Sequence, residues 1–167
     1  MKILGIDPGL QVCGYACLRM DSAGDELAEG GVFRTTTDAE MEVRLNQIAQ
    51  DISVVLKKFK PDYAAVEELY SHHKYPRTSI LMGHARGVIL QKCAEFGVEV
   101  KSFSATRIKK SLTDNGRGSK EQMQQAVKFV LSLDKVPEPH DVADAIAVAL
   151  CCANSLNAAK MILGSQA

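Results

Sequence analysis

The chain has 167 residues, of which 46% are hydrophobic and 24% charged, and its formal net charge at pH 7 is zero. This size and balance predict one soluble globular domain with a full core, and they exclude a disordered or uniformly basic chain. We expect no membrane partner, because no run approaches the roughly 20 apolar residues that a spanning helix needs. The five cysteines include no CxxC pair, so we expect reduced thiols in a cytoplasmic protein rather than disulfides or a zinc site.

The first third of the chain predicts three strands followed by a helix. Short apolar or alternating segments bounded by turn residues are typical of strands, and they lie at 2–7, 14–20 and 27–35. The turn between the second and the third strand is expected at 22–25. Apolar residues then recur at helical spacing from about 38 to 58, which predicts an amphipathic helix there.

The rest of the chain alternates strands and helices. Strands are expected at 63–69 and 98–103, and helices at 78–96, 104–112 (with Ser104 as N-cap), 119–133 and 140–150. Residues 1–154 are expected to form the single domain, and 155–167 a weakly patterned tail. The first three strands can pair antiparallel, whereas the later ones need crossover helices and should be parallel. The predicted fold class is therefore α/β, a mixed five-stranded sheet with helices on its faces.

Four carboxylates stand in or beside apolar segments, where a charge is costly. They are Asp7 at the end of the first strand, Glu67 within the fourth, and Asp141 and Asp144 at the head of the last helix. Singly, each has an ordinary explanation as a turn acid, an N-cap or a complement to the helix dipole. Together, buried without a cation, they would cost several kcal/mol each. Divalent metal ions are the natural compensation, because Mg²⁺ prefers carboxylates, water and phosphate oxygens, and a pair of ions can support phosphodiester cleavage.

Residue patterns alone leave open which of Glu67 and Glu68 faces such a site. Successive side chains on a strand point to opposite faces, so only one of the two can do so. The other is expected to be solvated or paired with a base.

A basic stretch accompanies the acids. Residues 101–120 carry six basic residues against a single acid, Asp114: Lys101, Arg107, Lys109, Lys110, Arg117 and Lys120. On a chain of zero net charge, such a cluster is either a solvated surface or a phosphate-binding face. Beside a metal site, it predicts that this stretch holds a nucleic-acid backbone.

Five segments, taken in chain order, resemble the RuvC-type Holliday-junction resolvases. They are GIDPG at 5–9, AAVEELY at 64–70, HARGVIL at 84–90, DNGRGSKEQM at 114–123 and DVADAIAVA at 141–149. GIDPG alone is a weak signal, and the specificity lies in the ordered set, which covers roughly residues 1–154. The resemblance implies a ribonuclease-H-like fold and a homodimeric, Mg²⁺-dependent endonuclease that cuts four-way DNA junctions by paired symmetric nicks.

The resemblance further implies how such an enzyme would work. It implies 5′-phosphate and 3′-hydroxyl ends, a role in recombination and repair, and branch-migration helicase proteins as partners. Two Mg²⁺ ions per subunit are expected, with Mn²⁺ as a substitute.

Carried over by position, the resemblance assigns catalysis and metal binding to the four acids, and it chooses Glu67 over Glu68. It assigns stacking near the junction centre to Tyr70, DNA contact to Lys109 and Lys120, and dimerisation to the helix that carries HARGVIL. From the basic stretch we add Arg117 to the DNA-binding residues.

Two departures from the family pattern bear on function. The stretch SHHKYPR at 71–77 differs from the family's usual loop, which puts the usual cleavage-sequence preference in doubt. His140 precedes Asp141, and it either assists the attacking water or simply begins the helix.

Three other classes of protein share parts of this pattern. GIDPG is also typical of the phosphate loop of actin-like ATPases and sugar kinases, but those proteins need two such lobes and this chain has room for one. A different nuclease of the same fold would act on RNA–DNA hybrids or single-stranded DNA, because fold does not fix substrate. A silent junction-binding protein would not need all four acids.

Overall fold

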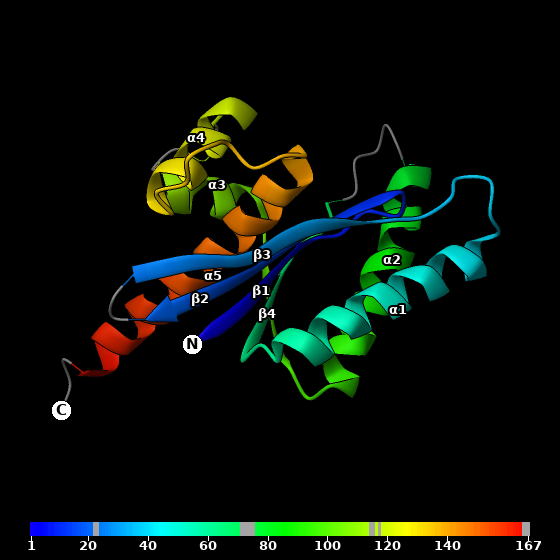
Figure 1. Ribbon diagram of the computed structural model, residues 1–167, viewed down its shortest axis with the longest axis horizontal. Coiled ribbons are helices and arrows are strands. Elements are labelled where there is room, and N and C mark those ends of the chain that lie inside the picture. Colours follow the sequence, from blue (N-terminus) through cyan, green and yellow to red (C-terminus); the bar gives the residue numbers. More distant parts are fainter. Residues whose placement is uncertain (22–23, 71–75, 114–115, 117, 165–167) are drawn as a thin grey trace.

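The protein is described here by a computed structural model that covers residues 1–21, 24–70, 76–113, 116 and 118–164 (Figure 1). Its sheet has the strand order β3-β2-β1-β4-β5. The strands are β1 (Lys2–Asp7), β2 (Val12–Asp21), β3 (Gly24–Arg34), β4 (Tyr63–Glu67) and β5 (Glu99–Phe103). β1–β2 and β2–β3 pair antiparallel, whereas β1–β4 and β4–β5 pair parallel. The predicted mixed five-stranded sheet is confirmed.

Helices cover both faces of this sheet (Figure 1). α1 (Met41–Phe59) and α2 (Pro76–Glu95) pack on one face, and α5 (His140–Gly164) packs on the other. α3 (Ala105–Thr113) and α4 (Lys120–Val130) lie on the outer side of α5. Neighbouring residues of β1 show the division, since Ile3 belongs to the α5 core and Leu4 to the α1–α2 core.

Local sequence accounts for where two of the helices begin. Ser119 caps α4 through a capping box with Gln122, because each side chain bonds the other residue's backbone N–H. Ser104 accepts a hydrogen bond from the backbone N–H of Arg107 at 3.4 Å, as expected of an N-cap. β4 ends at Glu67, two residues before the predicted end of that strand.

α5 is the longest helix described, and it differs from its prediction in two ways. It continues to Gly164, so residues 155–164 of the predicted tail are helical. The segment 140–162 is also long and apolar enough, by length and composition alone, to cross a membrane. From the sequence, no segment of this kind is expected. Of the most apolar window, 61% is buried inside the fold, so packing between the sheet and α3–α4 accounts for its apolar character.

Two glycines let α5 lie very close to the sheet. A β-carbon on Gly5 of β1 would lie 2.1 Å from the carbonyl oxygen of Ala145, and one on Gly14 of β2 would lie 2.1 Å from that of Asp141. Both distances are far below any real carbon–oxygen contact, so only glycine fits. Because Gly14 pairs with Asp7, this close approach also sets α5 beside the end of β1.

Candidate active site

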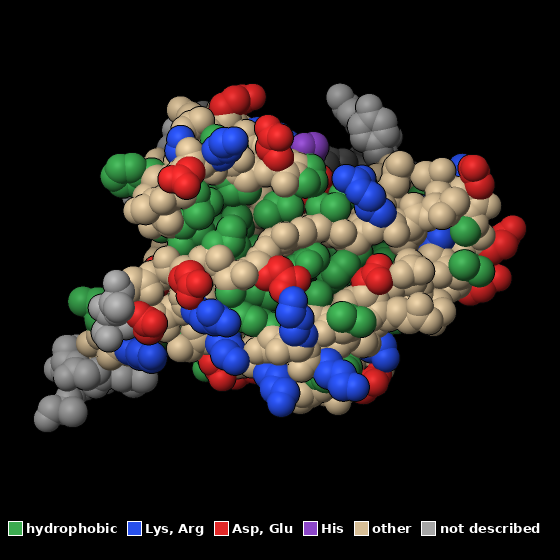
Figure 2. Space-filling model, viewed as in Figure 1, with side chains coloured by type: hydrophobic (Ala, Val, Ile, Leu, Met, Phe, Trp, Pro, Cys, Tyr) green, Lys and Arg blue, Asp and Glu red, His purple; other side chains and the backbone are tan. Residues whose placement is uncertain are grey.

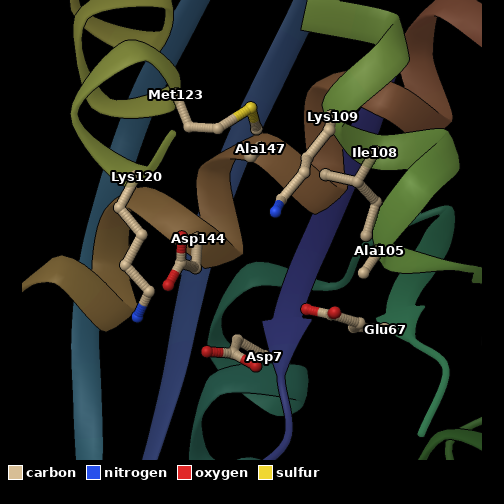
Figure 3. Close-up of a pocket in the computed structure, with 9 residues that line it drawn as sticks. All are labelled: Asp7, Glu67, Ala105, Ile108, Lys109, Lys120, Met123, Asp144 and Ala147. Atoms are coloured by element: carbon tan, nitrogen blue, oxygen red, sulfur yellow. The ribbon is translucent and has the colours of Figure 1, made fainter. Parts of the chain in front are cut away.

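The carboxyl ends of β1 and β4 open into a cavity of ≈ 300 Å³ beneath α3 and α4. Three acids, two lysines and four apolar side chains line it: Asp7, Glu67, Asp144, Lys109, Lys120, Ala105, Ile108, Met123 and Ala147. Figure 3 shows the three carboxylates facing a common space, with the two lysine side chains reaching into it from the helices. The cavity therefore brings together acids and bases from five separate elements.

Strand topology explains why Asp7 and Glu67 meet. Each is the last residue of its strand, and the two strands pair parallel up to Ile6 and Val66. Parallel neighbours end at the same edge of a sheet, so two side chains far apart in sequence become adjacent. Asp144 joins them from the second turn of α5, and the glycine contacts fix its height above the sheet.

Asp141 lies near this group but does not line the cavity. Its side chain is 21% exposed, and its Oδ2 lies 3.8 Å from Nε2 of His140. Its charge nevertheless helps to raise the pKa values of Asp7 and Asp144. Three of the four predicted acids thus share one cavity, and the fourth stands one helical turn before Asp144 on α5.

Burial and mutual repulsion make these carboxylates hard to ionise. Burial raises the pKa of Asp7 to about 6, and the charges of Asp144 and Asp141 add to the effect. Burial raises the pKa of Glu67 to about 7, helped by Asp7 and Asp144. Burial also raises the pKa of Asp144, against the opposing charges of Lys120 and His140. Each ionised carboxylate therefore costs free energy unless a cation lies nearby.

The two lysines supply part of the missing positive charge. Lys120 lowers the pKa values of all three cavity acids, and Lys109 lowers those of Glu67 and Asp144. Neither lysine belongs to any ion pair found within the described part of the chain. Their ammonium groups can therefore bind an anionic group that enters the cavity.

The donor set fits a hard divalent cation by its chemistry. Carboxylate oxygens are the ligands that Mg²⁺ prefers, and the acids repel one another in the way that a cation would relieve. Among the described residues, no three His, Cys, Asp or Glu side chains lie close enough together to hold an ion as they stand. The acids thus surround a shared space rather than a single point. All five cysteines are buried and free, as expected of reduced thiols.

Other predicted residues lie elsewhere. Glu68, the first residue after β4, is exposed and lines a separate hollow. Tyr70 is 84% exposed and does not line the cavity. Arg117 and most of the 71–77 loop lie outside the described residues. His140 begins α5, with its side chain 59% exposed.

The basic stretch divides once it is folded. Lys101 pairs with Glu99, and Arg107 lies over the ring of Phe103 and donates to Ser155 Oγ at 2.9 Å. Lys109 and Lys120 alone among its described members line the cavity.

Sequence reasoning missed the apolar wall between the two lysines. Ile108 is the buried residue of α3, and Met123 is one of two buried residues of α4; both helices are amphipathic. Helical spacing marks both as core residues, and nothing in it distinguishes core from cavity wall.

Comparison with known proteins identifies the family. The profile described as "Crossover junction endodeoxyribonuclease RuvC" matches residues 3–152. A protein of that name from Rhodopirellula baltica is 48% identical over 149 residues, which cover 89% of this chain and 84% of the relative. Solved structures of Thermus thermophilus RuvC, one titled as a complex with Holliday junction substrate, superpose with a TM-score of 0.82 at 30% and 29% identity, covering 90% of this chain and 92% of theirs. Nearly the whole chain, with the sheet that carries the acidic cavity, thus belongs to the RuvC family of crossover junction endodeoxyribonucleases.

Proposed function

We propose that this protein is a structure-specific endonuclease that resolves four-way (Holliday) DNA junctions in homologous recombination and repair. The observation that carries the proposal is the cavity where Asp7, Glu67 and Asp144 converge under Lys109 and Lys120. Carboxylates for metal ions beside ammonium groups for phosphates are what phosphodiester hydrolysis requires. The names of its relatives, and the junction substrate in one solved complex, support the choice of DNA substrate.

The metal site of this proposal consists of Asp7, Glu67, Asp141 and Asp144. These residues would hold Mg²⁺, two ions per subunit with Mn²⁺ as a substitute, and bound metal supplies water activation and charge stabilisation for hydrolysis to 5′-phosphate and 3′-hydroxyl ends. The protein's own part is to keep these carboxylates close together and partly buried.

DNA binding in this proposal depends on basic and aromatic side chains. Lys109 and Lys120 bind backbone phosphates at the cavity mouth. The exposed ring of Tyr70 stacks on a base near the junction centre, for which any base offers a suitable face. Arg117 extends the basic face, on the grounds of its sequence position alone.

The assembly in this proposal is a two-fold homodimer through α2, the helix that carries HARGVIL. Its outer surface is suited to a close contact, because Ile80, Gly83 and Gly87 are exposed there. A two-fold dimer suits a junction of approximate two-fold symmetry, since each subunit presents one site to one strand. Branch-migration helicase proteins as partners and a cytoplasmic location follow from the family resemblance.

The decisive experiment is cleavage of a labelled synthetic four-way junction with Mg²⁺, beside a linear duplex and an RNA–DNA hybrid. We expect paired, symmetric nicks in the junction alone. Asp7→Asn and a chelator should each abolish them. Cleavage of the hybrid or of single-stranded DNA instead would keep the nuclease and replace the substrate.

A further inference from the structure

Arg86 ties the end of β4 to two neighbouring elements. From α2, its Nε donates a hydrogen bond to the backbone carbonyl oxygen of Glu67 at 3.0 Å. Its Nη2 donates a second to Ser102 Oγ on β5 at 2.8 Å. A guanidinium group is planar and its donors are fixed relative to one another, so the two bonds together define where the end of β4 lies.

At Glu67, β4 is still paired with β5 but no longer with β1. The pairing of β4 with β1 stops one residue earlier, at Ile6–Val66, and its pairing with β5 stops at Glu67–Phe103. Beyond that point, the N–H of Glu68 donates to Phe103 O at 2.9 Å. Ends of strands open more readily than their centres, so a side chain that holds the Glu67 carbonyl acts where the strand is weakest.

The Glu67 side chain is also repelled by neighbouring carboxylates. Its carboxylate shares the cavity with those of Asp7 and Asp144. Like charges at short range push one another apart. A strand end held only by its ladder would yield to this repulsion by letting Glu67 turn toward solvent.

We propose that Arg86 is a positioning residue for Glu67, which holds the end of β4 so that the carboxylate stays in the cavity. Arg86 does not line the cavity itself, and it forms no ion pair with any residue that the structure describes. Both of its hydrogen bonds go to neutral acceptors on the sheet. The catalytic importance of Glu67 rests on the function proposed above, whereas the hold on β4 does not.

Amide hydrogen exchange in metal-free protein tests the hold on β4 directly. In Arg86→Ala, we expect the amide of Glu68 to exchange about fivefold faster, the effect of losing one hydrogen bond. The amide of Ala65, inside the strand, should keep its rate. Arg86→Lys keeps the charge but lacks the planar guanidinium group with its fixed donors, and it should give an intermediate exchange rate at Glu68. Lys92→Ala is the matched control on the same helix, because Lys92 pairs with Glu95 instead.

Junction cleavage by the same variants tests the consequence. We expect Arg86→Ala to lower kcat on the order of 10- to 100-fold, as small misplacements of catalytic groups do. KM and metal-free junction affinity should stay as in the parent protein, with Arg86→Lys between the two. Lys92→Ala should cleave like the parent protein.

Three results would overturn the proposal. An unchanged exchange rate at Glu68 would mean that Arg86 does not hold the strand end. Faster exchange throughout the sheet would mean that it supports only the fold. Loss of junction affinity with an intact kcat would make it a DNA contact. Failure of the parent protein to cut any junction would instead remove the proposed function and leave the exchange test standing.

Discussion

Asp7 is a partly buried carboxylate of the proposed metal site, and its charge lowers the stability of the metal-free fold. Its carboxylate is surrounded by other acids, and burial raises its pKa to about 6. At neutral pH the metal-free protein must therefore hold a charge that the fold disfavours. Such strained groups are common where function requires them.

Asp7→Asn should accordingly stabilise the metal-free protein while abolishing Mg²⁺-dependent cleavage. The amide has the same shape and no charge, so both the desolvation and the repulsion disappear. At about pH 8 with a chelator we expect a gain on the order of 1–2 kcal/mol, or roughly 2–4 °C in Tm per kcal/mol. Thermal unfolding measures this, with the exposed Asp38→Asn as control. A lower Tm would mean that the carboxylate makes a stabilising contact.

The pH dependence of stability follows from the same two pKa values. Asp7 and Glu67 have folded-state pKa values of about 6 and about 7, against ordinary values of 3.8 and 4.5. Between about pH 4 and pH 7 the folded state therefore binds more protons than the unfolded state. Their contribution to stability is present below this window and is lost as the pH rises through it, by on the order of 3 kcal/mol without metal.

Urea unfolding with a chelator at about pH 5 and about pH 8 measures this dependence. The hydrogen bond with Lys92 lowers the pKa of the exposed Glu95. Exposed acids of this kind change stability with pH in the opposite direction. The relevant quantity is therefore the difference from the double variant Asp7→Asn/Glu67→Gln, which should lose less stability on going to high pH. Equal slopes for the two proteins would refute the assignment.

Among the helices and strands, α5 has the largest part in the geometry of the candidate site, because its position on the sheet places two of the acids. It carries Asp141 and Asp144, and it reaches the sheet only because Gly5 and Gly14 leave room for its backbone. The site therefore depends on the lack of a side chain at Gly5 and Gly14 as well as on its acids. α3 and α4, which bear the two cavity lysines, pack against this helix.

Gly14→Ala should displace the start of α5 from β2. The new β-carbon would lie 2.1 Å from the Asp141 carbonyl oxygen, and a backbone cannot give way locally as a side chain can. We expect a loss of about 1–3 kcal/mol in the free energy of unfolding and a fall in kcat of at least about tenfold. Denaturant unfolding and junction cleavage measure the two effects.

Gly30→Ala is the matched control for this substitution. Its β-carbon would meet Cγ1 of Val142 at 2.8 Å, the end of a side chain, so a smaller loss of stability is expected. Equal losses in both variants would show that backbone crowding at Asp141 is not the cause.

Across the whole molecule, 20 Lys and Arg residues balance 20 Asp and Glu residues. Acidic and basic side chains are interspersed over the face in Figure 2. At the cavity, the two lysines instead stand beside acids that metal ions would neutralise. A neutral protein can therefore attract DNA to one place without binding it everywhere.

Lys109→Ala and Lys120→Ala should each weaken junction binding and flatten its salt dependence. Loss of one phosphate contact should reduce the slope of log K against log[salt] by about 0.9. Binding titrations across a range of salt, without metal, measure this slope. Lys110→Ala is the matched control, because Lys110 is the exposed neighbour of Lys109 and does not line the cavity. Unchanged slopes in both cavity variants would remove the lysines from the DNA face.

The order and type of the elements, and the candidate acids, follow from the sequence alone. Strand and helix periods are local signals, so the β1–β3 meander and helices α1 to α4 were predictable to within a few residues, whereas the end of α5 was not. Acids inside apolar runs such as YAAVE were conspicuous because burial leaves no place for an unpaired charge.

Which of these residues lie together in one cavity depends on the tertiary structure. It separated Asp144 from Asp141, divided the basic stretch into paired surface residues and cavity lysines, and placed Arg86 against the Glu67 carbonyl. In the folded structure α5 also continues to Gly164, and Arg107 of α3 donates a hydrogen bond to Ser155 on this helix. Periodicity specifies which face of an element is buried, but not how far the element slides or turns against its neighbours. Those displacements are set by contacts between distant segments, such as Gly14 against Asp141, which no local pattern records.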